Sequence, residues 1–253
     1  MILELDVGNS RIKWRVLNRD AQAGARHSGA LMGGAEDAAA KLFESIPRDL
    51  QLSAARGCSV GSELLLVELA EGLKARWGLE LDVAEVSAQC GGITNSYQEV
   101  GRMGVDRWLA MIAAFNRQKR ACLIVDAGTA LTIDLVADDG RHQGGYILAG
   151  LSMAVEALEN NTGITLRNRD FSLLAGPGTS TEQAVLGGAL SSTVSLILEA
   201  LGRLRCTDSE AMVYLCGGDA ELLAQALRLR GESGFTVEPD LVLDGLEYAC
   251  GNQ

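Results

Sequence analysis

Histidine is scarce in this sequence, which has only His27 and His142 among 253 residues. Neither has a partner at the spacing of a metal site or a catalytic triad, so we do not expect histidine chemistry. The six cysteines show no CxxC spacing, and several lie inside apolar runs, which favours small buried residues in a reducing compartment over disulfides or zinc ligands. The cysteines are Cys58, Cys90, Cys122, Cys206, Cys216 and Cys250.

Basic residues are also few: 22 Lys and Arg against 33 Asp and Glu give a net charge of −11. This balance argues against a nucleic-acid partner, although Arg11, Lys13 and Arg107 could form a small basic pocket for a nucleotide. No apolar run approaches the length needed to cross a bilayer, and the sequence opens on a strand rather than a signal peptide. We therefore expect a cytoplasmic protein without a membrane partner. A hydrophobic content of 47% with 22% charged residues is typical of soluble globular proteins.

The first seventeen residues contain two strand candidates separated by a turn. Residues 2–5 are mostly apolar, and residues 11–17 alternate between apolar and basic side chains, which predicts one buried face and one basic, solvent-exposed face. Between them, Asp6-Val7-Gly8-Asn9-Ser10 contains the Gly-Asn pair of a tight hairpin turn. A carboxylate at a strand end followed by a glycine turn suits a phosphate that carries a divalent cation. An ordinary hairpin turn is the alternative interpretation.

The same pattern occurs again at Asp126, 120 residues after Asp6. Asp126-Ala127-Gly128-Thr129 follows an apolar strand candidate and precedes a second one. A repeat this long predicts two halves with related folds, and two such turns could hold one polyphosphate between two domains. Chance duplication of a short pattern is the alternative.

Hydrophobic periodicity and turn residues predict an α/β protein whose sheets are mixed and flanked by helices. Strands are expected at residues 25–31, 51–60, 79–86, 121–125, 131–137 and 141–148. Helices are expected at residues 36–45, 62–77, 109–115, 151–160 and from 181 to about 204. Residues 87–103 form a long polar loop, a feature that is usually functional or disordered in a compact domain.

That loop leads into Gly104-Val105-Asp106-Arg107-Trp108, which we place at the start of a helix. An acid in the first helical turn is favoured by the helix dipole, whereas an arginine is not. Asp106 could therefore be a capping acid with Arg107 as its ion-pair partner. Alternatively, Asp106 is a general base that takes a proton from an alcohol, and Arg107 is an anion ligand. Because the helix dipole disfavours an arginine at this position, we favour a functional role for Arg107.

Glycines mark two further loops in the second half. Gly144-Gly145 and Gly150 precede a helix, where they let a ligand or a second backbone approach closely. Tight packing of the strand against the helix is the alternative interpretation. Gly217-Gly218, between a strand and a helix, is of a type that often holds a nucleoside or phosphate. Thr179-Ser180-Thr181 supplies an N-cap for the long helix.

These motifs, taken together and in this order, closely resemble those of type III pantothenate kinases over nearly the whole chain. They are Asp6-x-Gly8-Asn9-Ser10, Tyr97, Gly104-x-Asp106-Arg107, Asp126-x-Gly128-Thr129, Gly144-Gly145 and Gly217-Gly218. The family belongs to the superfamily of acetate kinases, sugar kinases, heat-shock chaperones and actin. The resemblance implies two duplicated ribonuclease H-like (actin-like ATPase) domains around a cleft, at residues 1–117 and 118–253. It also implies ATP-dependent phosphorylation of pantothenate to 4′-phosphopantothenate, the first step of coenzyme A synthesis.

The resemblance also implies roles for individual residues. Thr129 would bind ATP together with a run of eight residues that faces the phosphates. The run is Asp6, Val7, Gly8, Asn9, Ser10, Arg11, Ile12 and Lys13. Pantothenate would contact Tyr97, Gly104, Val105, Asp106, Arg107 and Thr181, with Asp106 as proton acceptor and Arg107 on the carboxylate. Asp6 would hold Mg²⁺ through water, and Asp126 a monovalent cation, K⁺ or NH₄⁺. The implied oligomer is a homodimer whose pantothenate pocket is closed partly by the partner subunit.

Two positions depart from the pattern of the family. Val100 and Ala149 stand where many relatives have proline, and both lie in connections that carry no reacting group. Two other functions fit the same fold: a non-catalytic ATP-binding regulator, and a phosphohydrolase that acts without pantothenate. The Gly104–Arg107 loop argues against a pure regulator, because a switch needs no general base.

Overall fold

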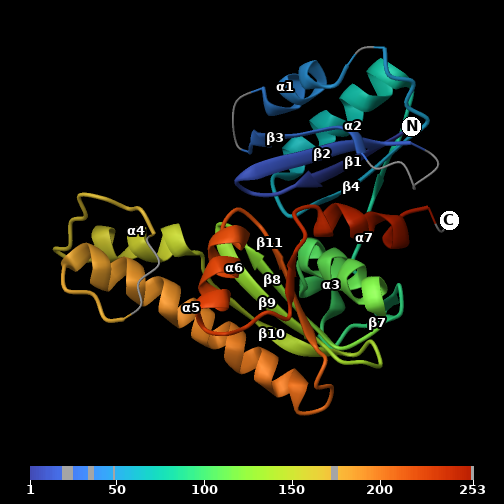
Figure 1. Ribbon diagram of the computed structural model, residues 1–253. Helices are drawn as coiled ribbons and strands as arrows, with labels where there is room; N and C mark the ends of the chain where they lie inside the picture. Colours follow the sequence, from blue (N-terminus) through green and yellow to red (C-terminus); the bar gives the residue numbers. More distant parts are fainter. Residues whose placement is uncertain (19–24, 34–36, 48, 172–175, 252–253) are drawn as a thin grey trace. The chain divides into compact units, whose positions relative to one another are not determined.

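The computed structural model describes residues 1–18, 25–33, 37–47, 49–171 and 176–251 (Figure 1). The chain forms two compact units. Unit 1 comprises residues 1–91, 97–113 and 242–253, and unit 2 comprises residues 92–96 and 114–241. The ranges 1–117 and 118–253 remain our proposal for the duplicated domains, because each range holds one five-stranded sheet.

The sheet of unit 1 is mixed, with strand order β3-β2-β1-β4-β5. Its strands are β1 (Ile2–Val7), β2 (Arg11–Leu17), β3 (Ala25–Met32), β4 (Ala54–Ser59) and β5 (Leu81–Val83). The β1–β2 and β2–β3 pairs are antiparallel, whereas β1–β4 and β4–β5 are parallel. The predicted order of strands and helices in the first half is therefore confirmed.

The sheet of unit 2 repeats this topology, with strand order β10-β9-β8-β11-β12. Its strands are β8 (Cys122–Ala127), β9 (Ala130–Val136), β10 (His142–Ala149), β11 (Met212–Cys216) and β12 (Phe235–Val237). Two antiparallel pairs are again followed by two parallel pairs. The two halves predicted from the 120-residue repeat thus have the same sheet. A short pair, β6 (Gln89–Cys90) and β7 (Ile93–Thr94), lies between the sheets in the sequence.

In unit 1, α1 (Ala38–Ser45) and α2 (Glu63–Trp77) cover one face of the sheet (Figure 1). The hydrophobic core on this face takes alternate residues of β1, including Leu3 and Leu5. The predicted helix 62–77 is α2, which Ser62 caps and Gly78, with φ +67°, ends. The described part of the other predicted helix, 36–45, is α1; residue 36 lies outside the described residues.

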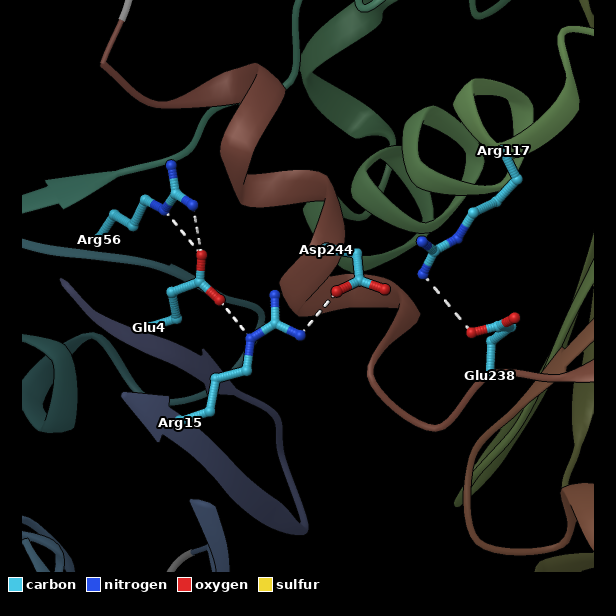
Figure 2. Close-up of polar contacts among 6 residues, drawn as sticks. All are labelled: Glu4, Arg15, Arg56, Arg117, Glu238 and Asp244. Atoms are coloured by element: carbon cyan, nitrogen blue, oxygen red, sulfur yellow. Dashed lines mark hydrogen bonds and ion pairs between the residues drawn. The ribbon is translucent and has the colours of Figure 1, made fainter. Parts of the chain in front are cut away.

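The opposite face of this sheet carries a buried group of charged residues (Figure 2). Glu4 is fully buried and accepts hydrogen bonds from Arg15 and from Arg56, whose Nη2 lies 2.5 Å from Glu4 Oε1. Arg15 Nη1 also donates to Asp244 Oδ1 at 2.6 Å. Asp244 belongs to α7 (Leu241–Ala249), so these ion pairs attach α7 to the sheet. The expectation of a solvent-exposed basic face on residues 11–17 is therefore wrong at Arg15.

In unit 2, α5 (Thr181–Arg205) and α6 (Ala220–Leu229) pack against one face of the sheet. By length and composition α5 could cross a membrane, with a mean hydropathy of 1.7 over 18 residues, so the expectation that no apolar run reaches that length is wrong. Core helices of soluble proteins pass the same test. Ile197, Leu201 and Leu204 of α5 are buried in the core of unit 2. Ser180 caps the helix, as predicted.

Of the remaining helices, α4 (Leu151–Asn161) is close to its predicted bounds. The helix predicted at 109–115 is α3 (Val105–Gln118), which is longer at both ends. The 3₁₀ helix η2 (Val100–Arg102) was not predicted. The predicted strand at 79–86 is shorter than expected, because only Leu81–Val83 pairs with β4. The predicted loop 87–103 contains β6, β7 and η2, so it has more secondary structure than the sequence predicts.

Candidate active site

The two aspartate turns have the same local structure in their respective units. Asp6 is the next-to-last residue of β1, and the Gly8 N–H donates to the Arg11 carbonyl at 3.0 Å. Asp126 is the next-to-last residue of β8, and the Gly128 N–H donates to the Ala130 carbonyl at 3.1 Å. Each aspartate is thus placed at the end of a buried strand, directly before a tight turn.

Side chains near the first turn differ in their access to solvent. Asp6 is half-buried and pairs in register with half-buried Lys13 on β2. Asn9, Ser10 and Arg11 are exposed on the turn. Val7 and Ile12 are buried in the core of unit 1. Any contact of Val7 or Ile12 with a nucleotide would therefore have to use the backbone, whereas the turn residues can offer side chains as well.

A buried cysteine lies beside one of the candidate carboxylates in unit 1. Cys58 of β4 stands in register with Asp6, and its thiol lies 3.7 Å from Asp6 Oδ1. Burial, followed by the negative charges of Asp6 and Asp106, raises the pKa of the Cys58 thiol well above its ordinary value. The thiol is therefore neutral at physiological pH and leaves the Asp6 carboxylate as the charged group of this pair.

Asp106 lies in the first turn of α3, as predicted. Its Oδ1 accepts the Arg107 N–H at 2.8 Å, which orients the carboxylate. Gly104 leaves the space that this carboxylate needs, because a Cβ at position 104 would lie 2.5 Å from Asp106 Oδ1. Val105 begins the helix and is buried. The Gly-x-Asp-Arg spacing thus has a direct steric reason.

Arg107 and Tyr97 form a second pair in unit 1. Arg107 is only 6% exposed, and its Nη1 donates to Tyr97 Oη at 2.8 Å. The guanidinium carbon is also 5.7 Å from the centre of the Tyr97 ring, within range of a cation–π interaction. These contacts orient the Arg107 guanidinium, which can bind an anionic group.

In unit 2, Asp126 is surrounded by close backbone approaches. Gly217 has φ +89°, and a Cβ there would lie 2.5 Å from Asp126 Oδ1. Gly150 donates its N–H to the Thr129 carbonyl at 3.0 Å, and a Cβ at Gly150 would meet the Gly128 carbonyl oxygen. At Gly150 the structure therefore contains the expected close approach of a second backbone, that of the turn after β8. Carboxylate and carbonyl oxygens are the hard donors that alkali and alkaline-earth cations prefer.

The remaining predicted residues lie at exposed positions of unit 2. Thr129 is exposed on the turn after β8, and Thr181 is the exposed first residue of α5. The structure therefore groups Asp6, Asp106, Arg107 and Tyr97 in unit 1. Asp126, Thr129 and Thr181 belong to unit 2.

His142 has two side-chain partners that its place in the sequence does not indicate. Its Nδ1 lies 2.9 Å from Ser96 Oγ, and its Nε2 lies 3.1 Å from Asp134 Oδ1. These partners are 46 and 8 residues away in the sequence, so no local spacing could indicate them. Cys58 was also missed as a neighbour of Asp6, because the β1–β4 register that joins them is not indicated by any local pattern.

Comparison with known proteins identifies the family. The family model for type III pantothenate kinase matches residues 2–203. A type III pantothenate kinase from Ectopseudomonas mendocina is 39% identical, and the match covers 99% of each chain.

Solved structures share the fold at low sequence identity. A candidate 2-dehydro-3-deoxygalactonokinase from Sinorhizobium meliloti is 16% identical with a TM-score of 0.59, covering 98% of this chain and 95% of that one. The activator of 2-hydroxyisocaproyl-CoA dehydratase from Clostridium difficile, with bound ADPNP, is 9% identical with a TM-score of 0.52, covering 97% and 92%. The fold is therefore the actin-like fold of kinases and ATPases. With a family match of this length and a relative of this identity, the chain belongs to the type III pantothenate kinases.

Proposed function

We propose that this protein transfers the γ-phosphoryl group of ATP to the primary hydroxyl of pantothenate, with Asp106 as the proton acceptor. The full-length similarity to type III pantothenate kinases supports the reaction most strongly. The grouping of Asp106, Arg107 and Tyr97 in unit 1 supports an acceptor site for an alcohol that also carries an anion. The product is 4′-phosphopantothenate, the first intermediate on the way to coenzyme A.

On the acceptor side, Asp106 receives the proton of the attacking alcohol. The alcohol oxygen forms a bond to the γ-phosphorus while the bond from that phosphorus to the bridging oxygen of ADP breaks. The proton of the alcohol passes to the Asp106 carboxylate, whose orientation is set by the Arg107 N–H. Because phosphoryl transfer depends mainly on positioning and charge, this base contributes through alignment and late proton removal.

The substrate side is formed by Tyr97, Gly104, Val105, Arg107 and Thr181. Arg107, already oriented by the Tyr97 hydroxyl, binds the pantothenate carboxylate, since a guanidinium pairs with a carboxylate through parallel hydrogen bonds. Gly104 and Val105 hold the start of α3, and Thr181 offers an exposed hydroxyl at the start of α5.

On the ATP side, the turn after β1 offers backbone N–H groups and the exposed side chains of Asn9, Ser10 and Arg11 to the phosphates, with Lys13 beside Asp6. Thr129 contributes from the matching turn of unit 2. The carboxylate of Asp6 fits Mg²⁺ held through water, because it is half-buried at the end of β1, directly before the turn. When bound, Mg²⁺ neutralises charge on the phosphates.

The monovalent cation, K⁺ or NH₄⁺, fits the surroundings of Asp126. Gly217 leaves space against the carboxylate, and carbonyl oxygens of the adjacent turns approach closely. A cation held there adds positive charge near the polyphosphate. The donor set consists of oxygens alone, which suits K⁺ better than a soft metal.

We also propose a cytoplasmic homodimer. Four large apolar side chains on β10 and α4 are exposed, which suits association with a second copy of the chain. They are Ile147, Leu148, Met153 and Leu158, at 63%, 36%, 41% and 40% exposure. Sedimentation of the wild-type chain and of an Ile147→Asp variant tests this association: the wild-type chain should sediment as a dimer and the variant as a monomer.

A coupled assay of ADP release, run with and without pantothenate, tests the reaction. We expect ADP release to depend on pantothenate, with one phosphopantothenate formed per ADP. Release at the same rate without pantothenate would identify a phosphohydrolase instead. Nucleotide binding without release in either condition would identify a regulator.

A further inference from the structure

Residues 92–96 form a short segment of unit 2 that is attached to the turn between β9 and β10. The Thr94 N–H donates to the Gly140 carbonyl at 3.0 Å, and Thr94 forms a parallel bridge with Arg141. Gly140 has φ +80°, and a Cβ there would collide with the carbonyl oxygen of Gly92. Backbone packing this close, with a positive φ, fixes the start of the segment.

The end of the segment is held by a buried histidine. Ser96 is exposed, but its Oγ lies 2.9 Å from Nδ1 of His142, which is 1% exposed. His142 Nε2 lies 3.1 Å from Oδ1 of Asp134, which is also 1% exposed. A carboxylate accepts but does not donate, so Nε2 carries a proton, and Nδ1 forms the hydrogen bond with the Ser96 hydroxyl. Asp134 thus sets the orientation in which His142 can hold Ser96.

Tyr97 follows Ser96 directly, and there the chain passes from unit 2 to unit 1. The Tyr97 hydroxyl accepts from Arg107 at 2.8 Å, and its ring lies 5.7 Å from the guanidinium carbon. One peptide bond therefore separates a serine held by a buried histidine from a tyrosine held by the candidate anion-binding arginine. The position of the Tyr97 phenol depends on both attachments.

We propose that His142, oriented by Asp134, is a positioning residue for substrate binding: through Ser96 it fixes Tyr97 against Arg107. This inference rests on the proposed function, in which Arg107 binds the substrate carboxylate. His142 is buried and acts through Ser96. Without this hydrogen bond, Tyr97 samples more positions, so Arg107 is less often oriented for the carboxylate. The substrate affinity falls while the chemical step, which depends on Asp106, is little changed.

Ser, His and Asp are also the components of a nucleophilic triad. The place of Ser96 directly before Tyr97 favours a positioning role instead. In that role, loss of the Ser96 hydroxyl would lower the substrate affinity. A nucleophilic serine would react covalently with a fluorophosphonate probe. The two roles therefore give different experimental results.

The test compares Ser96→Ala, which removes one exposed hydroxyl, with Ser96→Thr, which keeps it. Ser53→Ala is the matched control, because Ser53 is also exposed and donates to a backbone carbonyl far from this segment. We expect Ser96→Ala to raise KM for pantothenate by about 5- to 20-fold, with kcat within about twofold and KM for ATP unchanged. Ser96→Thr should restore KM, and Ser53→Ala should behave as wild type.

Hydrogen–deuterium exchange of peptides covering residues 94–100 tests the attachment independently of activity. We expect faster exchange in Ser96→Ala but not in Ser53→Ala. An unchanged KM for pantothenate, a fall in kcat alone, or labelling of Ser96 by the fluorophosphonate would overturn the inference, as would unchanged exchange. If the wild-type protein shows no pantothenate-dependent ADP release, the proposed function fails, and the exchange result still reports on the Ser96–His142 attachment separately.

Discussion

Glu4 and Asp6 lie two residues apart on the same face of β1, and the strand register gives each its own row of partners. Glu4 stands opposite Arg15 on β2 and Arg56 on β4, whereas Asp6 stands opposite Lys13 and Cys58 on the same two strands. The first row is a buried ion-pair group (Figure 2). The second row contains the candidate ATP-site carboxylate, so one face of β1 carries both a structural group and a candidate functional residue.

The Glu4 row predicts a large loss of stability when its carboxylate is removed. Glu4→Gln leaves the side chains of Arg15 and Arg56, which are 9% and 16% exposed, without their shared charge. Breaking a buried pair in this way lowers the free energy of unfolding by about 3–5 kcal/mol. Glu80→Gln is the control, because the Lys74–Glu80 pair is 68% and 78% exposed, so solvent screens it and its loss should hardly change the free energy of unfolding. Urea unfolding measures both, and equal effects of the two changes would contradict the role of burial.

The Asp106 assignment predicts a loss in the chemical step. Asp106→Asn keeps the hydrogen bond from the Arg107 N–H but cannot accept the alcohol proton, so kcat should fall by about 10²–10⁴-fold. Asp49→Asn, at an exposed position of unit 1, serves as the control for the same chemical change. Steady-state kinetics with saturating pantothenate and ATP measure the effect. Near-normal turnover in Asp106→Asn would remove this residue from the role of base.

The Asp126 assignment predicts a loss of cation dependence. Asp126→Ala removes the carboxylate beside Gly217, so the rate should no longer respond to K⁺. The measurement is a titration of K⁺ into a Na⁺-only buffer at fixed ionic strength, for the wild-type and variant proteins. A variant that still responds to K⁺ as the wild type does would place the cation elsewhere.

The fold could be predicted from local patterns because they recur in both halves. The period-two alternation of residues 11–17 and the Asp-x-Gly turns at Asp6 and Asp126 each predict a strand pair that the structure contains. The caps Ser62 and Ser180 begin helices at the expected places. These signals depend on near neighbours in the sequence, which is why they could be interpreted directly.

Partners brought together by tertiary structure could not be predicted in the same way. Arg15 follows a basic pattern typical of a solvent-exposed face, yet Glu4 and Asp244 make it a buried residue, and Asp244 is 229 residues away. His142 has no partner by sequence spacing, but it contacts Ser96 and Asp134. Burial of charge depends on such distant partners, so composition and periodicity underestimate it.

The ion pair between Arg205 and Glu232 predicts a loss of stability in acid. The hydrogen bond from Arg205 holds the pKa of Glu232 below its ordinary value of 4.5. A carboxyl whose pKa is lowered on folding stabilises the folded state above its unfolded pKa, and this stabilisation is lost as pH falls through the folded pKa. Urea unfolding from about pH 3 to pH 7 should therefore show Glu232→Gln less stable than wild type near neutrality, with the difference shrinking below pH 4.5. Glu44→Gln, at an exposed position, should show no such trend, and a constant difference for Glu232→Gln would contradict the ion pair.

Gly104 and Gly101 provide a matched pair that separates placement of the Asp106 carboxylate from general disturbance of the loop. A Cβ at Gly104 would lie 2.5 Å from Asp106 Oδ1, whereas a Cβ at Gly101 would meet nothing within 4 Å. A carboxylate is the flexible end of a side chain, so Gly104→Ala should displace it at little cost in unfolding free energy. A displaced base aligns poorly with the alcohol, and kcat should fall by about 10–10²-fold. Gly101→Ala should retain wild-type kinetics. Equal losses of activity in the two variants would mean that the loop as a whole, rather than the position of Asp106, limits the reaction.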